Sequence, residues 1–390
     1  MRQRRALILL SFAAFASTAA VRVCDPMLPQ LADAFSTTTG RAASVVTVFA
    51  VAYGVLQLFY GPLGDHYGKY RVVSIATLAC ALTSLACAFA PSISWLIVAR
   101  VFAGATSAAI VPLSVAWIGD NVPYQRRQAA IARFLVGSIT GMVAGSLLGG
   151  LFADTLGWRA AFVALAIVYL VVGAMLQVEH RRQIADVLAV DRTAPAEFQL
   201  WSQTQNVVRA PWARVVLVTV FAESVMLFGP LAFIPAYLHA RFGVSLFAAG
   251  ATAAVFGLGG LAYVALAPRL LQRLGETGLA VAAALLLFMA FVFLRFAPTA
   301  IWTVPAIFTI GLGFFMLHNT LQTNATQMVS TTRGTAVSLF AASAFTGQAV
   351  GVALASLIVD AVGVPWLFVA AAVTLPVIAL TFARMIRRRP

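Results

Sequence analysis

The stretch "GPLGDHYGKYR", residues 61–71, separates two long apolar runs of the chain. Gly61 and Gly64 allow two helices to approach closely, because glycine has no side chain, and Gly68 permits a tight turn. Lys69 and Arg71 place positive charge beside that turn. The apolar runs on either side have the length of ~20 residues that a membrane helix needs. The stretch therefore predicts a short basic turn between two membrane-spanning helices.

The composition extends this prediction to the whole chain. Of 390 residues, 62% are hydrophobic and 10% are charged, whereas soluble proteins are roughly 45–50% apolar and about 25% charged. Continuous apolar runs predict helices rather than a β-barrel, whose strands show only weak alternation. The fold class is therefore an all-α integral membrane protein with twelve transmembrane helices, expected at 6–34, 42–62, 72–90, 93–118, 128–151, 160–178, 213–239, 246–267, 277–296, 301–323, 335–358 and 364–384.

The basic residues indicate an orientation. The formal net charge is +14, but 20 of the 26 Lys and Arg residues fall in segments on one side of the predicted helices. The other side holds only Arg41, Arg159, Arg241 and Arg295. This is the positive-inside pattern, which places both termini in the cytoplasm and leaves no need for a nucleic-acid partner. Residues 1–20 also resemble a signal peptide, whose cleavage would leave eleven helices.

The helices divide into two halves. We expect an N-terminal six-helix bundle at residues 1–178, a cytoplasmic linker at 179–212 and a C-terminal six-helix bundle at 213–390. The stretch "APRLLQRLGETG", residues 267–278, is a second basic, glycine-containing segment at the position in the C-terminal half that corresponds to 61–71. Two such halves are typical of transporters whose substrate site lies near the membrane midplane between them.

The stretch at 61–71 resembles the loop signature of the major facilitator superfamily. Gly61, Leu63, Gly64, Asp65, Gly68, Lys69 and Arg71 match it, while His66 and Tyr70 depart from it. The resemblance implies two six-helix bundles around a central cavity, with alternating access by rocking of one bundle against the other. It also implies a gating role for this segment, in which Asp65 faces the start of the eleventh helix at 331–335. The alternative is a solvated charged turn.

The stretch "LIVARVFAGATSAA", residues 96–109, resembles a second signature of the superfamily. Arg100 and Gly104 match, and Ala103 replaces a glutamine. An arginine within the membrane usually faces a cavity or an ionic partner. The alternative is an arginine that extends to the outer membrane surface.

The stretch "GSITGMVAGSLLGG", residues 137–150, repeats glycine at every fourth position. Small residues at that spacing allow helices to pack closely in lipid. Gly141, Gly145, Gly149 and Gly150 resemble the fifth-helix signature of drug/proton antiporters, in which a proline stands where this chain has Ser146. The resemblance implies antiport and a conformational role for these glycines, and generic helix packing is the alternative.

The stretch "CDPMLPQLADAF", residues 24–35, resembles the first helix of twelve-helix drug/proton antiporters through Asp25, Leu28 and Pro29. Arg22 lies three residues before Asp25, so the two side chains are neighbours on a helix. Our hypothesis is that Asp25 carries the coupling proton and that Arg22 and Arg100 control its charge, since a nearby cation and burial act in opposite directions. A static ion pair is the alternative.

Glu223 is a second isolated acid, ~15 Å into the seventh helix at 1.5 Å per residue. With no basic residue near it in sequence, it is a second candidate for proton coupling or for binding a cation, or else a neutral carboxyl hydrogen-bonded across helices. On the tenth helix, His318 is expected to form an interhelical hydrogen bond, and a group that titrates near neutral pH is the alternative. The residues expected to line the substrate cavity are Tyr53, Gln57, Phe228, Tyr237, His318, Asn319, Gln322 and Gln348.

No phosphate-binding loop or catalytic constellation is visible, so we expect neither ATP-driven transport nor an enzyme. The three cysteines lie in apolar runs and suggest packing, with no disulfide framework and no metal site. We expect a monomer in the inner membrane of a bacterium, surrounded by lipid and without a cofactor, that uses the proton gradient to export small amphiphilic or drug-like molecules. The alternatives are proton-coupled uptake of a small organic nutrient and translocation of lipids or other amphiphiles.

Overall fold

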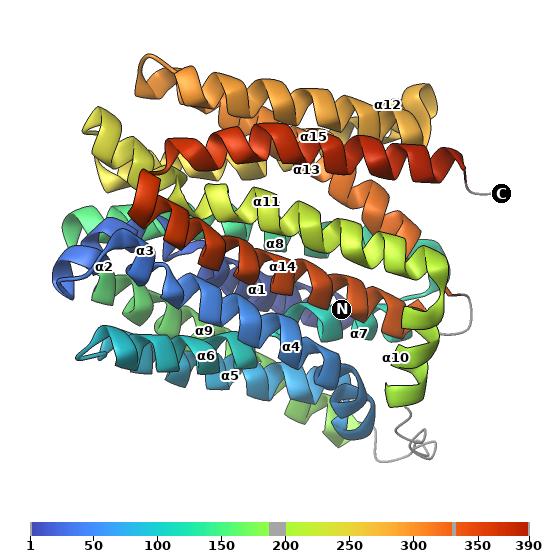
Figure 1. Ribbon diagram of the computed structural model, residues 1–390. Helices are drawn as coiled ribbons and strands as arrows, with labels where there is room; N and C mark the ends of the chain where they lie inside the picture. The colour runs from blue at the N-terminus through green and yellow to red at the C-terminus, as the bar shows by residue number, and fades with distance from the viewer. Residues whose placement is uncertain (1, 187–199, 330–332, 389–390) are drawn as a thin grey trace.

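The computed structural model describes residues 2–186, 200–329 and 333–388, and this part of the chain is helical throughout without any strand (Figure 1). The N-terminal half contains α1 (Arg2–Arg22), η1 (Asp25–Met27), α2 (Leu28–Ala34), α3 (Thr39–Ala42), α4 (Ser44–Tyr67), α5 (Lys69–Ala88), α6 (Ile93–Ser107), α7 (Ile110–Asn121), α8 (Tyr124–Thr155) and α9 (Trp158–Asp186). The C-terminal half contains α10 (Leu200–Arg209), α11 (Pro211–Phe242), α12 (Leu246–Phe296), α13 (Ala300–Ala325), α14 (Arg333–Val362) and α15 (Pro365–Arg387).

Eleven helical segments of the described residues are long and apolar enough to cross a membrane. One of them, α12, has 51 residues and covers two of the expected spans. Gly275 interrupts it with φ 62° and ψ 177°, so α12 is two helices that meet at a turn. With the two parts of α12 counted separately, the described residues contain twelve helices at the predicted spans, and the predicted turn at 267–278 lies where expected.

Two of the expected spans are not continuous helices. The first is broken after Arg22, where η1 and then α2 begin. Pro26 and Pro29 cause the break, because proline has no N–H to continue the helical hydrogen bonds. The fourth span is divided into α6 and α7, and Pro112 lacks the N–H that would bond to the carbonyl of Ala108.

The helices form two bundles joined by two long packing interfaces. In the N-terminal bundle α1 packs on α8 and α5 packs on α9, and in the C-terminal bundle α11 packs on α14 and α12 packs on α13 and α15. Between the bundles α8 packs on α12 and α4 packs on α14. The predicted linker at 179–212 includes the end of α9 and all of α10, and its residues 187–199 lie outside the described part of the chain.

Different parts of the chain lie at the two ends of the bundles. The C-terminus and α10 lie at the right of Figure 1, and the start of α1 lies towards the same end, which we call the termini end. The short helices α2 and α3 lie at the left, which we call the opposite end. The turn at Gly68 is at the termini end, because one crossing, α4, leads back to it from α3.

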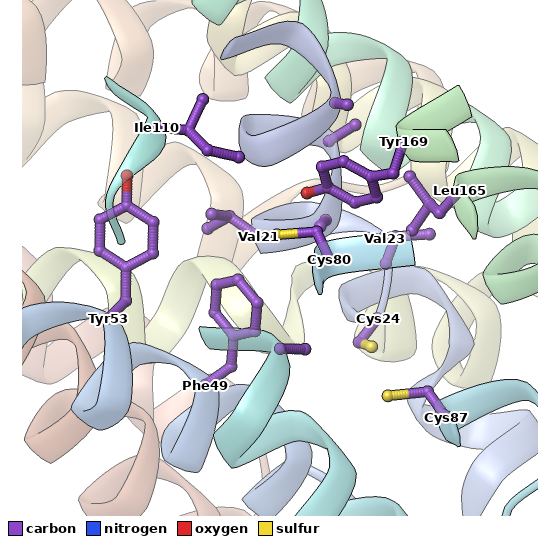
Figure 2. Close-up of a cluster of buried hydrophobic side chains, with 14 of the residues drawn as sticks. Val21, Val23, Cys24, Phe49, Tyr53, Cys80, Cys87, Ile110, Leu165 and Tyr169 are labelled. Atoms are coloured by element: carbon purple, nitrogen blue, oxygen red, sulfur yellow. The ribbon is translucent and has the colours of Figure 1, made fainter. Parts of the chain in front are cut away.

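The N-terminal bundle has a tightly packed core that includes all three cysteines. Figure 2 shows Cys24, Cys80 and Cys87 among apolar side chains and two tyrosines. The thiols are free and buried. The Cys80 sulfur lies 3.4 Å from the Ser107 hydroxyl, and that hydroxyl lies 3.3 Å from the Tyr169 hydroxyl. The cysteines are therefore packing residues, as expected.

Candidate functional site

The arginine and aspartate of the first span form a buried ion pair at the break between α1 and α2. Arg22 Nη1 lies 3.2 Å from Asp25 Oδ2, and only 4% of each side chain is exposed. The other carboxylate oxygen, Asp25 Oδ1, is buried and has no hydrogen-bond partner. A buried charge without a full set of partners is costly. Asp25 therefore has a free acceptor position for a proton, a water molecule or a substrate group.

Both bundles surround this ion pair. The Arg22 guanidinium lies 4.7 Å from the centre of the Phe228 ring, which belongs to α11 of the C-terminal bundle. A small hollow beside Arg22 and Asp25 is lined by residues of α8, α11 and α12, namely Met142, Val143, Ser146, Leu231, Ala253, Ala254, Phe256 and Gly257. Because the N-terminal bundle supplies the charges and the C-terminal bundle supplies much of the wall, a relative movement of the bundles would change the surroundings of Asp25.

Arg100 is buried beside the end of α1, in agreement with an intramembrane arginine that faces inward. It is 1% exposed and makes no ion pair with Asp25. Its guanidinium lies 4.0 Å from the centre of the Phe49 ring, and it donates hydrogen bonds to the carbonyls of Ala20, at 3.2 Å, and Val45, at 3.1 Å. Arg100 therefore fixes the last turn of α1 just before Arg22, and its burial excludes the alternative in which it extends to the membrane surface.

The C-terminal bundle buries a carboxyl group of its own. Glu223 on α11 is fully buried, and its Oε2 lies 2.9 Å from His318 Nδ1 on α13. The other oxygen, Oε1, is buried without a hydrogen-bond partner. No basic residue lies near Glu223 in sequence, but the packing of α13 against α11 brings His318, 95 residues away, into a hydrogen bond across helices, which is the contact of the second alternative. The interhelical hydrogen bond expected of His318 is present.

Among the expected cavity residues, Tyr53 of α4 contacts α14 of the other bundle, and Gln57 of α4 and Gln348 of α14 are buried. Tyr53 stacks on Phe345 of the other bundle with 4.1 Å between ring centres. Gln57 and Gln348 are 5% and 4% exposed, and the Gln57 amide nitrogen has no hydrogen-bond partner. Tyr53 and Phe228 thus place aromatic groups between the bundles.

The other expected cavity residues do not gather there. Tyr237 packs within the C-terminal bundle, with its ring 5.0 Å from that of Phe368 and its hydroxyl bonded to Arg241. Asn319 donates to the Tyr263 hydroxyl at 2.9 Å, within the same bundle. Gln322 is exposed near the termini end of α13. Sequence spacing gave no information on which face of each helix points between the bundles.

The segment 61–71 is more helical than expected. α4 continues through Tyr67, and the turn consists of Gly68 alone, with φ 91°. A Cβ on Gly64 would lie 2.6 Å from Leu113 Cδ2, so Gly64 does allow close packing. Gly61 does not, since no atom lies within 4 Å of the position a Cβ would take.

The charges of this segment form a small network. Lys69 Nζ lies 2.7 Å from Asp65 Oδ1 and 2.6 Å from Asp120 Oδ2 at the end of α7. Arg71 is exposed. The expected partner of Asp65, the start of the eleventh helix, falls partly on residues 330–332, which lie outside the described part of the chain.

The glycines of α8 form a continuous contact with α1. A Cβ at Gly141, Gly145 or Gly149 would overlap the backbone of Phe15, Ala19 or Val23 respectively. Glycines four residues apart on α8 thus contact backbone positions four residues apart along α1 and the turn that follows it. Gly150 faces the other way, against the backbone of Leu246 at the start of α12.

Two aspartates that the sequence analysis did not single out join the bundles at the opposite end. Asp154 on α8 accepts hydrogen bonds from the backbone N–H groups of Leu246, at 3.0 Å, and Phe247, at 2.6 Å. Asp360 on α14 accepts from the Thr38 hydroxyl, at 2.7 Å, and the Gly40 N–H, at 3.2 Å. Each carboxylate thus binds the first turn of a helix in the other bundle, where free N–H groups favour an anion.

A sequence signal for this pair exists in the half repeat. Asp154 is followed three residues later by Gly157, and Asp360 is followed three residues later by Gly363. Both glycines have positive φ, 85° and 90°. The two aspartates therefore occupy equivalent positions at the ends of the fifth and eleventh spans.

A family model described as the Major Facilitator Superfamily matches residues 10–332. The chain belongs to the major facilitator superfamily. The match covers most of the chain and includes both buried carboxyl groups and the turn at Gly68. The protein is thus a multi-pass membrane transporter, in agreement with its two bundles.

Curated relatives and solved structures of this superfamily share parts of the sequence or the fold. The facilitator is 27% identical over 161 residues to the uncharacterized MFS-type transporter YybF of Bacillus subtilis, a match that covers 41% of this chain and 40% of YybF. It is 28% identical over 164 residues to the multidrug export protein EmrB of Haemophilus influenzae, covering 41% of this chain and 32% of EmrB. The matches thus span less than half the length of these relatives.

A solved bacterial homologue of the human lysosomal transporter Spinster, in an inward-facing and occupied conformation, superposes with a TM-score of 0.77 over 98% of this chain and 96% of that chain. The sequence identity of 16% means that this likeness shows the fold alone.

Proposed function

We propose that this facilitator is a proton-coupled exporter of small amphiphilic or drug-like molecules that works by alternating access. The observation that carries the proposal is the position of the Arg22–Asp25 pair, which belongs to one bundle and is covered by Phe228 of the other. Two observations favour export over uptake. The chain is similar to a multidrug export protein, and the glycines of α8 that pack on α1 resemble the fifth-helix signature of drug/proton antiporters.

Coupling follows from a change in the surroundings of Asp25. With the bundles in contact at Phe228, Arg22 neutralises the carboxylate in a buried site. When the bundles rock apart, Arg22 loses its aromatic partner, water or a substrate cation reaches Asp25, and the proton is taken up or released. One proton moving down 100 mV supplies ~2.3 kcal/mol, which corresponds to nearly fifty-fold accumulation at ~1.4 kcal/mol per factor of ten.

We infer a cavity between the bundles that opens at the termini end. The four hydrogen bonds of Asp154 and Asp360 hold the bundles together at the opposite end. At the termini end, Gly61 faces open space and Gln322 is exposed. Together with the distribution of basic residues, this supports termini in the cytoplasm and a cavity open to it, in the inner membrane of a bacterium.

The test uses inverted membrane vesicles that contain the full chain and are acidified inside by respiration. Cationic, neutral and anionic amphiphiles are added one at a time while a pH-sensitive dye reports the interior pH. We expect proton release from the vesicles on addition of a substrate, and no release with Asp25→Asn. The matched control is Asp33→Asn, an exposed acid on the neighbouring α2, which should behave as the unaltered protein.

Two results would contradict the proposal. Proton release by Asp25→Asn equal to that of the unaltered protein would remove Asp25 from the coupling step. Proton movement in the same direction as an accumulated solute would show uptake of a nutrient in place of export.

A further inference from the structure

The N-terminal bundle has a surface groove that takes no part in the function proposed above. Two adjoining hollows of about 720 and 480 Å³ lie on either side of α1 and share Ile8. The first lies between α1 and α8, and the second lies between α1 and α9. We call the two together the α1 groove.

The α1 groove lies on the membrane-facing side of the bundle. The α8 residues of the groove are Arg133, Gly137 and Thr140, and those of the hollow beside Asp25 are Met142, Val143 and Ser146. At 3.6 residues per turn, the mean directions of the two sets differ by ~140°. The α1 groove and the hollow at the ion pair therefore share no residue and lie on different faces of α8, so a molecule in the groove has no contact with Asp25.

The floor of the groove is apolar and about as deep as one membrane leaflet. Ile8, Phe12, Met175 and Val178 are 45%, 55%, 52% and 50% exposed. From Arg4 to Phe15 the helix α1 rises ~17 Å, and half of the ~30 Å hydrocarbon core of a bilayer is ~15 Å. Acyl chains of one leaflet match both the length and the chemistry of this floor.

The mouth of the groove is basic. Arg4 and Arg133 line the first hollow at its termini end, and Arg5 and Arg182 line the second. All four arginines are exposed, and the one acid among the lining residues, Glu179, is buried. Arginine binds phosphate oxygens through two parallel N–H donors. Basic sites between helices on the cytoplasmic side bind anionic lipid headgroups.

We propose that the α1 groove is a binding site for an anionic phospholipid of the leaflet at the termini end, with acyl chains along Ile8 and Phe12 and the phosphate between the arginines. The lipid is bound at the outside of the bundle and is not the transported substrate. The lipid site does not depend on the transport direction or on proton coupling, so it can be tested independently of the proposed function.

The test measures lipid binding to the purified full chain in detergent. Phosphatidylglycerol and phosphatidylcholine with the same acyl chains are titrated, and retained lipid is counted by native mass spectrometry while the melting temperature is followed. We expect tighter binding of phosphatidylglycerol. The double variant Arg4→Gln/Arg133→Gln should weaken it about 25-fold, since ~1 kcal/mol per arginine near the membrane surface is a factor of about 5.

Matched controls distinguish lipid binding in the α1 groove from a general effect of positive charge on the protein. Arg273→Gln/Arg387→Gln removes two exposed arginines at the same end of the C-terminal bundle and should leave the affinity unchanged. Thr140→Trp fills the groove without a change in charge and should weaken both lipids. Equal weakening by the control pair, or unchanged binding by the groove variants, would overturn the proposal. Stabilisation by glycerol phosphate as large as that by the intact lipid would show a simple anion site and overturn it too.

Discussion

At the scale of single residues, each bundle contains a buried carboxyl group that has one oxygen paired and the other free, Asp25 in one bundle and Glu223 in the other. Asp25 is paired with Arg22 on the same segment, and Glu223 is paired with His318 on a different helix. The first pair is bounded by both bundles, whereas the second lies within one. We therefore propose that the coupling step uses Asp25 and that Glu223 modulates it.

Glu223→Gln tests this division. Glutamine keeps an oxygen that accepts from His318 but carries no titrating group, so the fold should be retained. We expect substrate-induced proton release to fall without being abolished, in contrast to Asp25→Asn. Glu179→Gln, which changes another buried acid in the same way, is the control. Unchanged proton release per substrate in the Glu223 variant would show that this carboxyl is purely structural.

Arg100→Met tests the structural role of the buried arginine. Arg100 donates to Ala20, whose carbonyl lies in the last turn of α1 and lacks a regular helical partner. Loss of these bonds and of the contact with Phe49 should destabilise the protein by about 3–5 kcal/mol, since a buried unsatisfied group costs ~1–3 kcal/mol and a desolvated cation–π contact ~2 kcal/mol.

The measurement for Arg100→Met is the temperature at which the monodisperse peak is lost on size-exclusion chromatography in detergent. Arg41→Met, at an exposed arginine, should melt with the unaltered protein. Equal melting temperatures of the two variants would show that Arg100 does not contribute to the stability of the fold, and would favour a direct role in transport.

At the scale of elements, α8 is the helix on which the architecture depends. One of its faces lies against α1 through glycine, a second packs on α12 of the other bundle, and a third borders the α1 groove. Lipid provides no hydrophobic force between helices, so their association depends on close packing of small residues. The glycines of α8 supply that packing for α1, which carries Arg22.

Gly141→Val should separate α1 from α8, because even a Cβ at position 141 would overlap the backbone of Phe15. We expect a loss of folded protein at the membrane, measured by the yield of monodisperse chain after solubilisation. Gly119→Ala on α7 is the control, since no atom lies within 4 Å of the added Cβ, and the better helix propensity of alanine by ~1 kcal/mol should stabilise it slightly. A Gly141 variant with a normal yield would contradict the close contact.

At the scale of the whole molecule, the two bundles are joined at the opposite end by a symmetric pair of carboxylates. Asp154 reaches from the N-terminal bundle to the start of α12, and Asp360 reaches from the C-terminal bundle to Thr38 and Gly40. Each contact consists of hydrogen bonds to a negatively charged group, worth ~1.5–3 kcal/mol apiece in favourable cases. Together they bias the molecule towards closure at this end.

Asp154→Asn/Asp360→Asn should shift the bundles towards opening at the opposite end. Spin labels at Leu156→Cys and Phe296→Cys, two exposed positions near that end of different bundles, report the separation by pulsed electron paramagnetic resonance. We expect an additional population at longer distance in the double variant. Asp33→Asn, an exposed acid at the same end, is the control, and an unchanged distance distribution in the double variant would contradict the closing role.

The sequence by itself determined the membrane environment, the twelve crossings, the glycine turns at Gly68 and Gly275 and the family. These features depend on local composition and short spacing, which lipid solvation converts directly into helices. The pairing of Arg22 with Asp25 was also accessible, because both residues lie within one helical turn.

Only the tertiary structure decided which distant groups meet. It paired Glu223 with His318, turned Arg100 towards the carbonyl of Ala20, and placed Tyr237 within a bundle core. Helical periodicity gives the relative faces of residues on one helix, but the rotation of that helix against its neighbours depends on packing along its whole length. For that reason the composition of the space between the bundles, including the carboxylate contacts of Asp154 and Asp360, could be read only from the assembled fold.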